Sequence, residues 1–387
     1  MLLHRQLDLQ IILIFSRNFY VRVTRSKPEH QPPMRFILAA AAVALALPTL
    51  ALPTLALSTL ILSTPAQAAG EVNIYSSRHY DTDERLYSDF EEATGITVNR
   101  IEDKANVLIE RIKAEGSNSP ADILLTVDAG RVYQADQSGM FQPVRSAVLE
   151  ERIPANLRHS DGHWFGFSTR ARVIFYDKAK IDPADIPTYA SLAEPRFKGM
   201  VCTRSSSNIY MLSLMAAMIE RVGEQDAKAW AQGVWDNRAR DPEGGDTDQL
   251  RAIASGQCAI ALANTYYFAR ALSQEVRGLA NPQDTSRIGV VFPDQAGAGT
   301  HVNVSAGGVV ATAPNRDNAV AFLEYLASDT AQKYFADGNN EYPVVKGIAP
   351  SPALASMGTF KADDMPLTVL GENQAQAQAI YNAVGYQ

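Results

Sequence analysis

Two long extended segments, residues 164–177 and 302–311, interrupt an otherwise regular alternation of short strands and helices. Both are rich in β-favouring residues and are much longer than an ordinary strand of about five or six residues. The alternation around them is typical of α/β proteins with parallel sheets. We therefore predict two α/β lobes joined by two extended crossover strands. Because ligands often bind between domains, we expect a ligand cleft between the lobes.

The remaining hydrophobic pattern assigns shorter elements to these lobes. Residues 122–127 form a nearly continuous apolar run, as in strands that are buried on both faces. We also predict a helix capped by Asp83 and one amphipathic helix over residues 318–335. The other expected elements are strands at 71–75, 95–101 and 287–292, and helices at 106–114, 211–221 and 246–256. The predicted boundaries are 69–170 with 300–345 for the first lobe, and 171–299 with 346–387 for the second.

The N-terminal segment belongs to neither lobe. Residues 36–64 carry no charge, Met34 and Arg35 precede them, and the small-x-small sequence at 66–68 follows. This order is typical of a secretory signal peptide, so we expect residues 1–68 to be a leader that is cleaved near residue 68. The alternative is an uncleaved membrane anchor through residues 36–64, because about 20 apolar residues suffice to span a bilayer.

Composition excludes several classes of function. The 387 residues include 35 Lys and Arg against 42 Asp and Glu, a net charge of −7, whereas generic nucleic-acid binders usually present a basic face. The motifs of P-loop, dinucleotide-binding, serine-hydrolase and Cys-x-x-Cys redox proteins are all absent from the sequence, which favours a protein that is not an enzyme. In an exported chain, Cys202 and Cys258 are plausible disulfide partners, with two buried free thiols as the alternative.

His159 and His163 are four residues apart, a spacing that suits zinc on a helix. The Asp-Gly pair between them is typical of a turn. We therefore interpret both as loop residues that precede the first long extended segment, and not as metal ligands.

The most informative polar residues are tyrosines and one histidine at the carboxyl ends of predicted strands, where α/β lobes bind ligands. His79 and Tyr80 follow the first strand, Tyr210 ends a polar run, and Tyr266 and Tyr267 end another strand. A single tyrosine is more often a packing residue, but four phenols and an imidazole together suit Fe³⁺, a hard cation that prefers anionic oxygen. The neighbouring Arg78 and Arg204 could offset the charge of the phenolates.

The chain resembles the ferric-iron-binding periplasmic proteins of iron ABC transporters, particularly their FutA-type branch. Five stretches carry this resemblance, at residues 72–80, 162–173, 204–210, 264–267 and 339–344. It implies a type II periplasmic binding protein fold, a monomer in the periplasm, and an ABC permease as the partner.

The resemblance also implies the ligand set for Fe³⁺, namely His79, Tyr80, Tyr210, Tyr266 and Tyr267. In the related FbpA-like branch a Glu and an exogenous anion complete the iron shell. Tyr80 and Tyr210 are present here instead, so an obligatory synergistic anion is doubtful. Asn264 could bind an anion or order its loop. The alternatives are a binder of phosphate, polyamine or thiamine with the same fold, an exported metalloenzyme, and tyrosines that only pack the core.

Overall fold

The computed structural model describes residues 70–78 and 83–386. The predicted leader, and the alternative of a membrane anchor through residues 36–64, lie outside the described residues. None of the described helices combines the length and the apolar character that crossing a bilayer requires.

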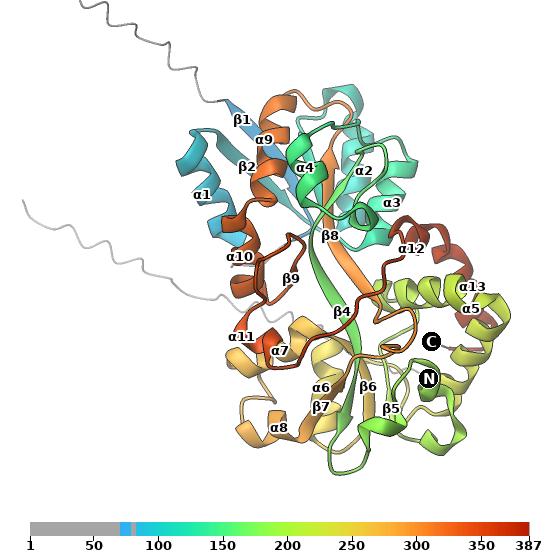
Figure 1. Ribbon diagram of the computed structural model, residues 1–387. Coiled ribbons are helices and arrows are strands. Elements are labelled where there is room, and N and C mark those ends of the chain that lie inside the picture. Colours follow the sequence, from blue (N-terminus) through green and yellow to red (C-terminus); the bar gives the residue numbers. More distant parts are fainter. Residues whose placement is uncertain (1–69, 79–82, 387) are drawn as a thin grey trace, which may run out of the picture. The chain divides into compact units, whose positions relative to one another are not determined.

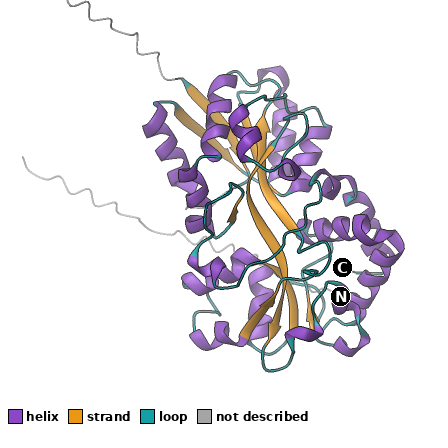
Figure 2. Ribbon diagram, viewed as in Figure 1, coloured by secondary structure: helices purple, strands orange, loops and turns teal. Residues whose placement is uncertain are grey.

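The first lobe is built on parallel strands in the order β2, β1, β3, with β8 (Val302–Val309) antiparallel to β3. Its elements are β1 (Glu71–Ser76), α1 (Glu84–Thr94), β2 (Thr97–Glu102), α2 (Ala105–Glu115), β3 (Ile123–Val127), α3 (Ala129–Gln137) and α4 (Ala147–Arg152). The first four residues of β3 are buried, as the apolar run at 122–127 predicts. Helices cover the strands, as Figure 2 shows.

The second lobe is built around β6, which runs parallel to β5 and antiparallel to β4 (Phe165–Asp177). Its elements are β5 (Val201–Cys202), α5 (Ile209–Asp236), α6 (Asp246–Ala254), β6 (Ile260–Asn264), α7 (Thr265–Ser273), α8 (Pro282–Arg287) and β7 (Ile288–Val291). The C-terminal helices α12 (Thr368–Glu372) and α13 (Gln374–Ala383) both pack against α5, and α12 also packs against α3.

The strands β4 (Phe165–Asp177) and β8 (Val302–Val309) are the two predicted crossovers (Figure 1). Residues 165–171 of β4 pair with β8, whereas residues 172–177 pair with β6 and β7 of the second lobe. Every residue of both strands is buried. The great length of β4 follows from this double membership, because one strand supplies hydrogen bonds to both sheets.

Two predictions about helices are wrong. The segment expected to form one helix over 318–335 forms α9 (Arg316–Leu326) and α10 (Asp329–Asn339). The Ser328 hydroxyl accepts the backbone N–H of Ala331 at 3.2 Å, so a capping residue begins a new helix there.

The chain also forms β9 (Tyr342–Pro343), which pairs with β4, and α11 (Pro352–Ala355).

Asp83 occupies the N-cap position of α1, but its carboxylate does not cap the helix. It accepts hydrogen bonds from Arg78 at 2.9 and 3.1 Å and from the Asn339 amide at 2.6 Å. A buried guanidinium is a stronger partner for a carboxylate than a backbone N–H group, which explains the difference.

Gly308 of β8 provides a test of the close packing at the crossover. A Cβ atom at this position would lie 2.1 Å from the backbone carbonyl oxygen of His163. We expect Gly308→Ala to lower the free energy of unfolding by about 1–3 kcal/mol, because backbone atoms on both sides must move. Urea denaturation measures the change.

Gly297→Ala is the matched control, since its Cβ would meet its nearest neighbour at an ordinary 3.7 Å. Equal unfolding midpoints for the two variants would contradict the expected strain at Gly308.

Candidate metal centre

Three phenol side chains meet where two helices of the second lobe begin. Tyr210 is in the first turn of α5, and Tyr266 and Tyr267 are in the first turn of α7. The hydroxyl oxygens of Tyr210 and Tyr266 are 3.2 Å apart, although 56 positions separate them in the sequence. The ring centroids of Tyr266 and Tyr267 are 4.2 Å apart. The phenols thus lie in helical turns that directly follow loop or strand residues.

The helix starts affect the charge that these phenols can carry. The first N–H groups of a helix lack intrahelical partners and create a positive potential that favours anions. Asn208 uses one such group in α5, where its side-chain oxygen accepts the N–H of Tyr210 at 3.0 Å. Tyr210, Tyr266 and Tyr267 all lie within the first turns of these two helices.

Burial has the opposite effect on ionisation. Tyr266 is only 3% exposed. Burial, assisted by the neighbouring Tyr210 and Asp246, holds the pKa of Tyr267 well above its ordinary value, although Arg204 acts in the other direction. Tyr267 is therefore a neutral phenol at physiological pH unless a strongly bound cation displaces its proton.

A buried carboxylate holds two arginines beside the phenols. Asp246 pairs with Arg172 at 3.2 Å and with Arg204 at 3.5 Å. The guanidinium carbons of Arg172 and Arg204 lie 5.9 and 5.2 Å from the ring centroid of Tyr210. Arg204, which was predicted to offset the charge of the phenolates, thus lies directly beside the group formed by Tyr210, Tyr266 and Tyr267, which we call the phenol cluster.

Asn264 precedes α7 and contacts the same charged group. Its side-chain oxygen accepts a hydrogen bond from Arg172 at 3.0 Å, and its backbone N–H donates to Asp246 at 2.8 Å. Asn264 therefore fixes the junction between β6 and α7, whose first turn carries Tyr266 and Tyr267.

Arg170 of β4 is a residue that the sequence analysis missed. Burial opposes its charge, but Glu341, Tyr210, Tyr266 and Asp128 together hold its pKa above the ordinary value. Its Nη1 donates to Ser305 at 3.0 Å, while Nε and Nη2 have no hydrogen-bond partner among the described residues. A buried cation with two unused donors therefore lies near two phenols. The sequence does contain a feature that could have indicated its role: Arg170 and Arg172 are two arginines within a strand that is otherwise largely apolar.

Arg78 lies in a different set of contacts from Arg204. Its guanidinium donates to Asp83, to Glu341 at 3.1 Å and to Ser305 at 2.7 Å. Ser305 also accepts from Arg170, so the residue that precedes His79 is linked to the phenol cluster through β8. His79 and Tyr80, the two predicted ligands of the first lobe, lie outside the described residues.

The fold and the site define a class of protein, the two-lobed type II periplasmic binding proteins. A family model described as "Bacterial extracellular solute-binding protein" matches residues 118–357, and the chain belongs to this family. "Iron uptake protein A2" of Synechocystis is 51% identical over 318 residues, which are 82% of this chain and 90% of the relative.

Solved structures agree with this grouping. The structure of Trichodesmium FutA (IdiA) in complex with iron and citrate ligands has a TM-score of 0.79 and 50% identity, covering 82% of this chain and all of that one. The ferric binding protein from Campylobacter jejuni has a TM-score of 0.76 and 40% identity over 82% of this chain and 100% of its own. Within its family the chain is FutA-like.

Cys202 and Cys258 form a disulfide in the structure, with their Cα atoms 5.9 Å apart. Cys202 is the last residue of β5, and Cys258 lies two residues before β6, which pairs with β5. The bridge therefore joins the starts of the two segments that lead to Tyr210 and to Tyr266.

We expect reduction of this bridge to lower the free energy of unfolding by about 2–4 kcal/mol, because closing a loop of this length restricts the unfolded chain. Denaturation with and without reductant measures the difference, and non-reducing mass spectrometry checks that the bridge is present. The double variant Cys202→Ala/Cys258→Ala should not respond to reductant. Two thiols that alkylate without prior reduction would show that the bridge does not form.

Proposed function

We propose that the mature protein captures Fe³⁺ between its lobes and delivers it to the permease of an ABC iron-uptake system. The observation that carries this proposal is the meeting of Tyr210, Tyr266 and Tyr267 at two helix N-termini beside buried arginines. Phenols that need a cation to lose their protons suit a small, highly charged, oxygen-seeking ion. Phosphate, polyamine or thiamine would gain little from such a cluster.

The proposed ligands are His79, Tyr80, Tyr210, Tyr266 and Tyr267. Four phenolates would give a trivalent ion one excess negative charge, and Arg204 and Arg170 would offset it. Because five protein ligands leave one position of a six-coordinate ion, an anion could bind there without being obligatory.

The proposed cycle needs no bond-making chemistry, so we propose a transport protein and not an enzyme. Residues 1–68 would be removed on export to the periplasm, and the mature chain would act there as a monomer. Its lobes would comprise 69–170 with 300–345, and 171–299 with 346–387. Binding would favour the closed arrangement by the difference in affinity between the two states.

A visible-absorbance titration of the mature chain with chelated Fe³⁺ tests this function. We expect a red-orange band from phenolate-to-iron charge transfer that saturates at one equivalent. Tyr266→Phe with Tyr267→Phe should abolish the band and tight binding, because the variant lacks both phenolate oxygens.

Tyr133→Phe is the matched control, since Tyr133 lies on α3 and its ring packs over Gly371 of α12. Circular dichroism would show that both variants are folded. A wild-type protein that remains colourless, or a double variant that keeps full affinity, would refute the ligand assignment.

Iron affinity should fall as the pH decreases. The pKa of Tyr267 is raised by burial, so Fe³⁺ must displace a tightly held proton. Each phenolic proton released on binding makes the apparent affinity fall about tenfold per unit of pH below that pKa. Competition with citrate between pH 5 and 8, corrected for protonation of citrate, measures the slope. A slope of zero would mean that no phenolic proton is lost.

A further inference from the structure

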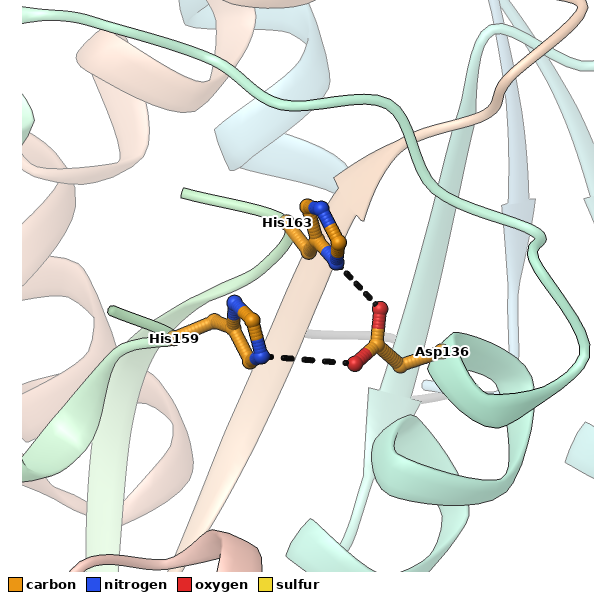
Figure 3. Close-up of side chains that lie close together, drawn as sticks. All are labelled: Asp136, His159 and His163. Atoms are coloured by element: carbon orange, nitrogen blue, oxygen red, sulfur yellow. Dashed lines mark hydrogen bonds and ion pairs between the residues drawn. The ribbon is translucent and has the colours of Figure 1, made fainter. Parts of the chain in front are cut away.

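A second group of metal-binding side chains lies in the first lobe. Asp136 is near the end of α3, and His159 and His163 lie in the loop before β4 (Figure 3). One carboxylate oxygen of Asp136 is 2.7 Å from Nδ1 of His163, and the other is 3.5 Å from Nε2 of His159. The three ligand atoms all lie within 4.8 Å of one another.

A tight turn brings the two histidines together. Gly162 has φ +76°, and a Cβ atom there would lie 2.2 Å from the carbonyl oxygen of Val144, so only glycine fits. The N–H of Gly162 donates to the carbonyl of His159 at 3.0 Å and closes the turn. The two imidazole rings stack with centroids 4.5 Å apart and an angle of 5°. The prediction of a loop is confirmed, and the turn places both imidazoles beside the same carboxylate.

The carboxylate of Asp136 lacks a permanent counter-charge. It is only 8% exposed, and its ion-pair partners among the described residues are the two imidazoles. No Lys or Arg of the described segments pairs with it within 4.0 Å, the distance that defines an ion pair here. A buried carboxylate is stabilised by pairing with a positive charge, and an imidazole carries no permanent one. A divalent cation would supply that charge.

The donor atoms select a class of metal. Imidazole nitrogen with carboxylate oxygen suits Zn²⁺ and similar divalent transition metals, which take three protein ligands and one water in a tetrahedral site. At usual bond lengths of about 2.0–2.2 Å, neighbouring ligand atoms are roughly 3.4 Å apart. The observed separations of 2.7 and 3.5 Å involve different oxygens of Asp136, and all three ligand atoms lie within 4.8 Å, so rotation of the side chains is needed to reach this spacing.

Zinc must also replace existing hydrogen bonds. Nδ1 of His159 accepts the backbone N–H of Asp161 at 3.2 Å. Coordination through Nε2 leaves the proton on Nδ1, so this long hydrogen bond is lost when the metal binds. The loss reduces the affinity, and we therefore expect weaker binding than at a closed four-ligand zinc site.

We propose that Asp136, His159 and His163 form a binding site for Zn²⁺ or a similar divalent transition metal, separate from the phenol cluster. The two sites differ in the metal that their donor atoms prefer. Imidazole and carboxylate suit a borderline divalent ion, whereas phenolates suit a hard trivalent ion. A metal there ties the end of α3 to the loop that leads into β4.

Isothermal titration of the mature protein with Zn²⁺ tests this proposal. We expect one equivalent to bind to the wild-type protein, and the affinity to fall at least tenfold in His163→Gln and in Asp136→Asn. Asp136→Asn keeps the shape of the side chain, so it separates lost ligation from lost folding. Co²⁺ in place of Zn²⁺ would give visible bands of tetrahedral geometry in the wild-type protein, and these bands should be absent from His163→Gln and Asp136→Asn.

His79→Gln is the matched control, because it removes the imidazole of the proposed iron site. This variant should keep its affinity for Zn²⁺, and His163→Gln should keep the charge-transfer band with Fe³⁺. Wild-type protein without saturable Zn²⁺ binding would show that the three side chains only hydrogen-bond to one another. Loss of Zn²⁺ binding in His79→Gln, or unchanged binding in both triad variants, would equally overturn the proposal.

Discussion

The buried pairing of Arg172 with Asp246 is the interaction on which the candidate metal centre depends. Both side chains are at most 2% exposed, and their charged atoms are 3.2 Å apart. Such a pair offsets its own desolvation only when further hydrogen bonds satisfy both groups, and Asn264 supplies one to each. The crossover β4, the helix α6 and the start of α7 are thereby fixed around one point, and the phenols take their positions from these elements.

Positive charge surrounds the phenols before any cation arrives. Arg170, Arg172 and Arg204 come from two segments of the chain, and the first turns of α5 and α7 add the partial charge of their N–H groups. These charges oppose a bare cation, and Arg204 partly offsets the burial that keeps Tyr267 protonated. The balance suits a trivalent ion bound by several anionic oxygens, and it disfavours ions of lower charge that would leave the phenols protonated.

Much of the fold could be predicted from periodicity, because long apolar strands and amphipathic helices are local properties. The crossovers, β3 and the strand before Tyr266 follow this rule. The charged network could not be predicted, since Arg170 and Ser305 are 135 positions apart and Arg172 and Asp246 are 74 positions apart. The helix break at Ser328 was not predicted, and neither was the stacking of His159 on His163. Each depends on the geometry of one turn, which hydrophobic periodicity does not reveal.

The two crossovers are adjacent, antiparallel and hydrogen-bonded to each other over residues 165–171 of β4. A single strand between two lobes would act as a swivel, free to twist in any direction. Two hydrogen-bonded strands form a ribbon. The ribbon resists bending in the plane that contains both strands, and it bends more readily perpendicular to that plane. Relative movement of the two lobes is therefore easiest in the one direction in which this ribbon bends.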